Sequence, residues 1–180
     1  MNLSTAASFE AADAESAIEE QLNRLLTENG PALLRLAASY TNTSSDRDDL
    51  VQDIAIALWK ALPRFRGECS ERTFLFRVAH NRAIDFLRRH HAPTSPIDAE
   101  SPIHDARPNP EAGLAQEQQG ERLRRAIHRL PLPYRQVITL TLEEMSYSEI
   151  AAILGVTETN VGVRLNRARQ LLRQFLEKSK

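Results

Sequence analysis

Cysteine and histidine are scarce in this chain of 180 residues. Cys69 stands alone, which excludes an internal disulfide and a zinc site made of several cysteines. His80, His90 and His91 have no set of neighbouring ligands at metal-binding spacing, so we expect them at the surface. The sequence therefore predicts no metal site.

Long apolar runs are also missing. No segment approaches the roughly 18 consecutive apolar residues that suggest a membrane span. The N-terminus is acidic where a secretion signal would be apolar. We expect a protein of the reducing cytoplasm that does not contact a membrane.

Catalytic motifs are absent too. The chain has no glycine-rich phosphate loop, no serine, histidine and aspartate in a context suited to nucleophilic attack, and no cofactor ligand set. We therefore expect a protein that is not an enzyme and that binds no cofactor.

Glycine is rare, with 6 residues, and alternating runs of Val, Ile or Thr are hard to find. Ala, Leu, Arg and Glu dominate instead, and all four favour helices. This composition predicts an all-α fold.

Apolar residues recur at helical spacing in two stretches, which are separated by a segment rich in proline and acidic residues. We expect two small helical domains joined by a flexible linker. The predicted parts are a flexible tail over 1–16, a first domain over 17–91, the linker over 92–113 and a second domain over 114–178.

The helices of both domains can be placed from periodicity and from turn residues. In the first domain, Gly30-Pro31 should interrupt the first helix. The predicted helices lie near 17–40, 46–61, 72–90, 114–129, 133–143, 147–154 and 158–177.

The net charge of −1 hides a segregation of charge along the chain. Residues 61–92 hold seven basic and three acidic side chains, and residues 157–180 hold six and two, whereas 1–60 and 93–121 are acidic. A polyanion such as nucleic acid would therefore be held at two places.

The last two predicted helices have the pattern of a helix-turn-helix. Ser146 and Glu149 form a capping box, Gly155 suits a left-handed helix end, and Thr157 can cap the next helix. Val161 and Leu165 begin the buried side of that helix, so its opposite side faces outward. This geometry fits a DNA major groove, although an ordinary pair of helices with a solvated basic face is the alternative.

The outward side of the helix over 158–177 is polar and basic, and its arginines can contact phosphates or bases. Val163 is apolar yet faces outward, so contact with a thymine methyl group is a reasonable hypothesis. Gly162 costs about 0.5–1 kcal/mol in a helix relative to alanine, although it would let the backbone approach DNA closely. The candidate DNA-binding residues are Thr159, Asn160, Gly162, Val163, Arg164, Asn166, Arg167 and Arg169.

The helix over 46–61 has an outward side that combines acidic with apolar residues. An exposed Trp59 and Ile56 beside acids would be a docking surface for a protein with a basic rim. The alternative is that Trp59 belongs to the core. The candidate docking residues are Asp48, Asp49, Gln52, Asp53, Ile56 and Trp59.

The helix over 72–90 and the loop before it combine aromatic, basic and amide groups. Such groups suit single-stranded bases, because rings stack on unpaired bases and arginine follows the phosphates. The alternative is that the aromatic residues are core, which we favour for Phe74 and Phe76. The candidate residues are Phe65, Arg66, Thr73, Arg77, Asn81 and Arg88.

In combination, three motifs make the chain resemble the sigma-70 family, and specifically its extracytoplasmic-function (ECF) sigma factors. The motifs are DRDDLVQDIAIALWKAL, RTFLFRVAHNRAIDFLRRH and LPLPYRQVITLTLEEMSYSEIAAILGVTETNVGVRLNRARQLL. Together they cover roughly 17–91 and 120–176.

The resemblance implies a role for each domain in directing RNA polymerase to promoters. The docking residues of the first domain would bind the clamp helices of the polymerase β′ subunit. The loop and helix over 65–88 would bind the melted −10 element. The second domain would place the helix over 158–177 in the −35 major groove and contact the polymerase β flap, and an unidentified anti-sigma factor would restrain the protein.

Two departures from the family pattern and two other functions remain. Phe74 stands where the family often has Trp, and Asn160-Val161-Gly162-Val163 replaces a common Thr-Val-Lys/Arg-Ser, so the −35 preference is open. A sigma-like decoy would bind an anti-sigma factor without binding DNA. A helix-turn-helix repressor would leave the first domain without a role.

Overall fold

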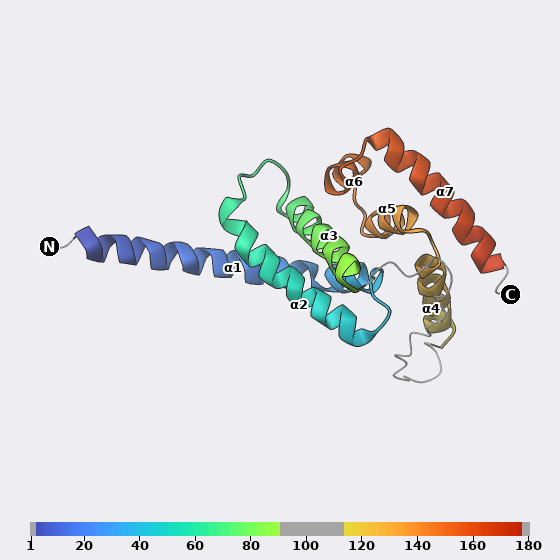
Figure 1. The fold of residues 1–180 in the computed structure, drawn as a ribbon, viewed down its shortest axis with the longest axis horizontal. Helices are drawn as coiled ribbons and strands as arrows, with labels where there is room; N and C mark the ends of the chain where they lie inside the picture. The colour runs from blue at the N-terminus through green and yellow to red at the C-terminus, as the bar shows by residue number, and fades with distance from the viewer. Residues whose placement is uncertain (1–2, 91–113, 178–180) are drawn as a thin grey trace.

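The structure, a computed structural model, describes residues 3–90 and 114–177. Every regular element in these two ranges is helical, so the all-α prediction is confirmed. Figure 1 shows α1, α2 and α3 on one side of the molecule and α4 to α7 on the other. The elements are α1 (Leu3–Ala38), α2 (Ser44–Ala61), the short 3₁₀ helix η1 (Leu62–Arg64), α3 (Glu71–His90), α4 (Leu114–His128), α5 (Leu132–Leu142), α6 (Tyr147–Leu154) and α7 (Glu158–Glu177).

The first domain is a bundle of α1, α2 and α3 around an aliphatic core. Thr43 caps α2 by accepting a hydrogen bond from the backbone N–H of Asp46 at 3.0 Å, and Ser70 does the same for Thr73 at the start of α3. Between these helices, η1 contains Pro63, which cannot continue the α-helix. The fully buried side chains of this core include Leu25, Leu33, Leu36, Leu50, Ile54, Leu58, Leu75 and Phe76.

The break predicted at Gly30-Pro31 is wrong, because Pro31 lies inside α1. Proline removes one helical hydrogen bond and usually bends or ends a helix. Here Leu25 on one side of Pro31 and Leu33 on the other are both buried in the same core, so packing holds the two halves in one helix.

The helix also begins earlier than expected. The sequence predicted a flexible tail over 1–16, whereas α1 starts at Leu3. Alanines and acidic residues dominate this stretch, which has neither glycine nor proline, and helix propensity favours the extension. The predicted linker over 92–113 lies outside the described residues.

The second domain packs α4, α5 and α6 against α7. Residues recurring along α7 are fully buried, as the heptad-like spacing of Val161, Leu165 and Ala168 predicted. The Arg129 guanidinium lies 4.7 Å from the centre of the Phe175 ring and fixes the base of α4 to the end of α7. Within the described ranges, no helix is long and apolar enough to cross a membrane.

The prediction that His80 lies at the surface is wrong. Its side chain is buried, and its Nδ1 lies 2.9 Å from the hydroxyl of Tyr40, a residue of the turn after α1. Burial lowers the pKa of His80 to about 4, because the core cannot solvate the charged imidazolium. His80 is thus a neutral core residue that joins α3 to the end of α1.

We expect acid to destabilise the fold through His80. The unfolded chain takes up a proton near pH 6.5, whereas the folded one resists it down to about pH 4. The stabilisation is therefore complete above pH 6.5 and is lost as the pH falls toward 4. Between pH 7 and pH 5 the loss should be about 2 kcal/mol in the free energy of unfolding.

Urea denaturation at the two pH values measures this loss. His80→Gln keeps an acceptor for Tyr40 but has no group that titrates in this range, so it should remove most of the difference. An equal loss in the wild type and in this variant would contradict the assignment.

Candidate nucleic-acid and protein interfaces

A groove runs between α1 and α2, and most of the predicted docking residues line it. Its two adjoining hollows share Ala55. One hollow is lined by leucines of α1 and by polar residues of α2, namely Leu26, Leu33, Leu34, Asp48, Asp49 and Gln52. The other hollow is lined by Leu22, Ile56 and Trp59, with Glu19 and Asn23 beside them. The groove is apolar with an acidic rim.

Trp59 lies at the surface, with 42% of its area exposed, so the alternative that it belongs to the core is wrong. Ile56 is 48% exposed and lies in the same hollow. Asp53 departs from the group, because its carboxylate faces α3 and accepts a hydrogen bond from Arg89 at 2.7 Å. It borders the groove rather than lining it.

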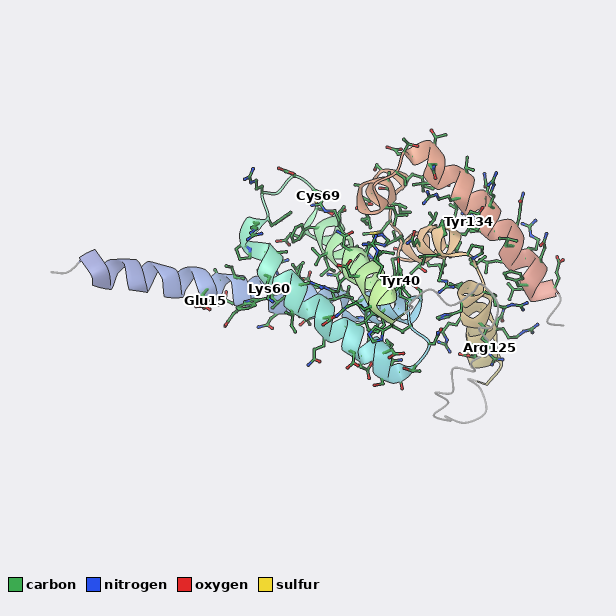
Figure 2. All side chains as sticks on the ribbon, in the orientation of Figure 1. Glu15, Tyr40, Lys60, Cys69, Arg125 and Tyr134 are labelled. Carbon is green, nitrogen blue, oxygen red and sulfur yellow. The ribbon has the colours of Figure 1, made fainter. Side chains whose placement is uncertain are left out.

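Aromatic and basic groups meet where the loop over 65–70 joins α3. The rings of Phe65 and Phe74 lie 4.6 Å apart, and the Arg77 guanidinium lies 5.7 Å from the centre of the Phe74 ring. Phe74 and Phe76 are buried, as predicted, while Phe65 is half-buried and Arg66 is exposed. Figure 2 shows this loop, marked by Cys69, projecting from the end of α2.

Farther along α3, Asn81 and Arg88 are exposed. The guanidinium of Arg88 lies 3.6 Å from the carboxylate of Asp85 on the same helix. Thr73 is separated from the other candidates, because it is buried and its hydroxyl donates to Glu149 of α6 at 3.1 Å. The structure therefore brings together most of the predicted single-strand face but covers Thr73.

The helix-turn-helix forms as the sequence predicted. Ser146 accepts a hydrogen bond from the backbone N–H of Glu149, whose carboxylate accepts one from the backbone N–H of Ser146 at 2.9 Å. The Ser146 hydroxyl also donates to this carboxylate at 2.7 Å. That bond, followed by the one from the backbone N–H of Ser146, lowers the pKa of Glu149 below its usual value. Gly155 ends α6 with φ 66°, and Thr157 accepts from the N–H of Asn160 at 3.2 Å.

The outward face of α7 is polar and basic. Among the predicted residues, Gly162 and Arg164 are half-buried, and Arg164 lies at the margin of the face. Arg167 reaches the hydroxyl of Tyr134 on α5 at 3.5 Å, which orients its guanidinium across the domain. The exposed candidates are Thr159, Asn160, Val163, Asn166, Arg167 and Arg169.

Among the described residues, no three His, Cys, Asp or Glu side chains gather where they could hold a metal ion. The observed faces instead suit macromolecules, with one apolar groove and two basic surfaces on different domains.

Comparison with known proteins identifies the family. Residues 25–92 match the model of sigma-70 region 2, and residues 120–172 match that of sigma-70 region 4. The RNA polymerase sigma factor CnrH of Cupriavidus metallidurans is 31% identical over 98% of this chain and 97% of its own length. The chain belongs to the ECF sigma factors of the sigma-70 family.

Further relatives agree with this assignment. The ECF sigma factor SigM of Mycobacterium tuberculosis is 33% identical over 80% of this chain and 71% of its own. The solved structure of CnrH in complex with the cytosolic domain of CnrY is 29% identical, with a TM-score of 0.69 over 94% of this chain and 96% of that one. RpoE of Bartonella quintana, solved with NepR, shares the fold at 21% identity and a TM-score of 0.64 over 90% and 98% of the two chains.

In this sigma factor the two domains contact each other, which the sequence did not indicate. Figure 1 shows α6 lying against the start of α3. The Arg35 guanidinium donates two hydrogen bonds of 2.7 Å to the carboxylate of Glu143, and Arg72 donates to the backbone carbonyl of the same residue at 2.9 Å. The side chain of Glu143 is 4% exposed, so its charge depends on Arg35 for compensation.

A second part of this contact surrounds the turn after α1. Arg135 of α5 donates to the carbonyl of Ser39 at 3.2 Å, and burial lowers its pKa. Burial also raises the pKa of Tyr40, beside which Arg135 and Gln136 lie. Figure 2 shows Tyr40 where the two domains meet. The residues that join the domains could not be recognised from hydrophobic periodicity, because each of them is a single polar residue near a helix end.

Removing the Arg35–Glu143 pair should separate the domains. Arg35→Gln leaves a buried carboxylate without its cation, and we expect the closed arrangement to lose about 1 kcal/mol, a roughly fivefold change in the equilibrium, after allowing for the exposure of Arg35. Electron-spin distance measurements between labels at Ser45 and Gln174, with Cys69→Ser, measure the populations.

Arg24→Gln is the matched control, because Arg24 pairs with Glu71 inside the first domain at 2.8 Å. It should leave the distance distribution unchanged. An unchanged distribution in Arg35→Gln, or an equal shift in Arg24→Gln, would contradict the role of this pair.

Proposed function

We propose that this sigma factor binds core RNA polymerase and directs it to promoters by contacting the −10 and −35 elements with different domains. The observation that carries the proposal is the placement of two basic faces, on α3 and on α7, in separate domains that a chain segment joins. The chemistry of the α3 face suits single-stranded DNA, and that of the α7 face suits the major groove of a duplex.

The groove between α1 and α2 is the surface proposed for polymerase. Exposed Ile56 and Trp59 supply the apolar area that dominates many protein interfaces, and Asp48 and Asp49 supply complementary charge for a basic partner. The clamp helices of the β′ subunit are the proposed occupant, while the second domain would contact the β flap.

The α3 face is proposed to hold the melted −10 strand. Phe65 is half-buried beside the exposed Arg66, so a ring edge and a cation are available together. Asn81 and Arg88 extend the face along the helix. Stacking on a ring and pairing with phosphate are the two interactions that single strands require.

The α7 face is proposed to enter the −35 major groove. The preceding α6 and its tight turn fix the orientation of α7, so Thr159, Asn166 and Arg167 project together. Arg164 and Arg169 flank this face on opposite sides and are positioned for phosphates on the two walls of a groove.

Simultaneous contact with both elements requires the domains to separate. Elements centred about 25 base pairs apart lie roughly 85 Å apart along the duplex, at about 3.4 Å for each step. The 23 residues over 91–113 can span at most about 80 Å, to which the size of each domain adds. In the proposed cycle, binding to polymerase replaces the Arg35–Glu143 contact.

In this role the chain carries out no catalytic step. Its role is regulatory, and polymerase supplies the chemistry. Because polymerase acts inside the cell, the cytoplasm is the proposed location.

The structure of CnrH with the cytosolic domain of CnrY supports a further expectation, that a protein inhibitor restrains this sigma factor as well. A candidate inhibitor should displace the chain from core polymerase in competition binding. A partner that binds both free and polymerase-bound chain equally would not be such an inhibitor.

Run-off transcription tests the proposal. Core polymerase with the protein should produce specific start sites on genomic fragments, and core polymerase alone should not. A decoy would bind an inhibitor yet produce no transcripts, and a repressor would bind duplex DNA without core polymerase. Either result would overturn the proposal.

Substitutions test each surface separately. Trp59→Ala should weaken binding to core polymerase about tenfold or more, since it removes a large apolar contact. The neighbouring exposed Lys60→Ala is the control and should change it little. Fluorescence anisotropy with labelled protein measures both affinities, and equal affinities would remove Trp59 from the interface.

A substitution in the proposed −35 face should act on promoter binding, and one in the proposed −10 face should act on promoter opening. Arg167→Ala should weaken binding of the holoenzyme to −35 promoters about tenfold, whereas Gln174→Ala, farther along α7, should not.

Asn81→Ala should lower the yield of open complex without weakening duplex binding, and Asn42→Ala in the same domain is its control. Permanganate footprinting measures opening, and an unchanged yield would exclude Asn81.

A further inference from the structure

The centre of the outward face of α7 is apolar. Val163 is 48% exposed and is surrounded on its helix by polar and basic residues such as Asn166 and Arg167. Its neighbour Gly162 has no side chain, which leaves part of the helix backbone uncovered on the side nearest α6.

Tyr147 of α6 covers this part of the backbone. Its Cε2 atom lies 3.6 Å from the position that a Cβ atom of Gly162 would occupy, which is ordinary van der Waals contact. The side chain of Tyr147 is nevertheless 43% exposed. One side of the ring therefore packs on α7 at the residue before Val163, while the rest of the ring remains exposed.

This arrangement depends on the glycine. An alanine at 162 would touch the ring without displacing it, because 3.6 Å is a normal contact. A long side chain would compete with the ring for the same space. Gly162 thus lets a residue of α6 take a position that the recognition helix itself would otherwise fill.

Two exposed apolar side chains inside a basic surface need an apolar group on their ligand. In the DNA major groove the only such group on a base edge is the 5-methyl group of thymine. The arginines on either side, Arg167 and Arg169, carry charge that complements the phosphates and disfavours a basic protein partner here.

We propose that Tyr147, whose ring packs at Gly162, and Val163, the next residue of α7, recognise two neighbouring thymine methyl groups in the −35 element. The inference rests on the proposed function and extends it to a residue outside the recognition helix. Tyr147 is a specificity-determining residue that acts through its ring, and its hydroxyl is not required.

The first experiment removes only the methyl groups. The holoenzyme selects its −35 element from duplexes randomised in that region, and binding is then compared between the selected duplex and copies with deoxyuridine in place of single thymines. Base pairing is retained. The wild type should lose roughly fourfold in affinity at each of two adjacent positions.

Variants assign each position to its residue. Tyr147→Ala should abolish the methyl effect at one position and Val163→Ala at the adjacent one. Tyr147→Phe keeps the ring and should retain the effect. Loss of affinity in Tyr147→Phe equal to that in Tyr147→Ala would show a hydroxyl contact with phosphate instead and would overturn the inference.

A substitution at position 162 should change the base that the holoenzyme selects in the −35 element. Gly162→Arg should displace the ring and shift the selected base at the Tyr147 position from thymine toward guanine, which arginine recognises through two hydrogen bonds. Gly162→Ala is the matched control and should keep thymine. The same selected base in both variants would overturn the inference.

The outcomes separate the inference from the proposed function. A holoenzyme that initiates at specific sites but shows no loss with deoxyuridine overturns the inference alone. A chain that forms no holoenzyme and changes no start site overturns both.

Discussion

The carboxylate of Glu143 is buried at the end of α5, and a buried charge is tolerated only with a partner. Arg35, in the last turn of α1, supplies that partner through two hydrogen bonds. This single requirement draws the last turn of α1 to the loop that begins the helix-turn-helix. Other contacts between the domains involve Arg72, Arg135 and Thr73, so the relation of the two faces proposed to bind DNA depends on this contact region.

That relation also explains why the surfaces proposed for the −10 and −35 elements differ in accessibility. The α7 face lies on the far side of its domain from α3 and stays exposed. The start of α3 is covered by α6, and Thr73 is buried there. With the two domains in contact, the molecule therefore exposes the α7 face more fully than the α3 face.

Local signals in the sequence predicted most of the fold. The capping box of Ser146 and Glu149, the left-handed Gly155 and the capping Thr157 placed α6 and α7 at their observed bounds, because each signal acts within a few residues. The surface position of Trp59 could not be decided from periodicity alone, since one helix can be buried on two sides.

What sequence reasoning missed depends on distant residues. Pro31 was assigned to a break, but tertiary packing on both sides overrides the local preference. His80 was expected at the surface because it has no neighbouring metal ligands, but it is buried against Tyr40, which lies 40 positions away and gives no local signal. The contact of Arg35 with Glu143 spans 108 positions, and no local pattern marks either residue. The Tyr147 ring was missed because its relation to Gly162 exists only once α6 and α7 have folded together.

Glu149 uses its two carboxylate oxygens for different purposes. Oε2 closes the capping box with Ser146, and Oε1 accepts the hydroxyl of Thr73 in the other domain. When the domains part, water can take the place of that hydroxyl while the helix cap stays intact. The carboxylate of Glu149 thus allows the second domain to replace its contact with Thr73 by water while the first turn of α6 stays capped.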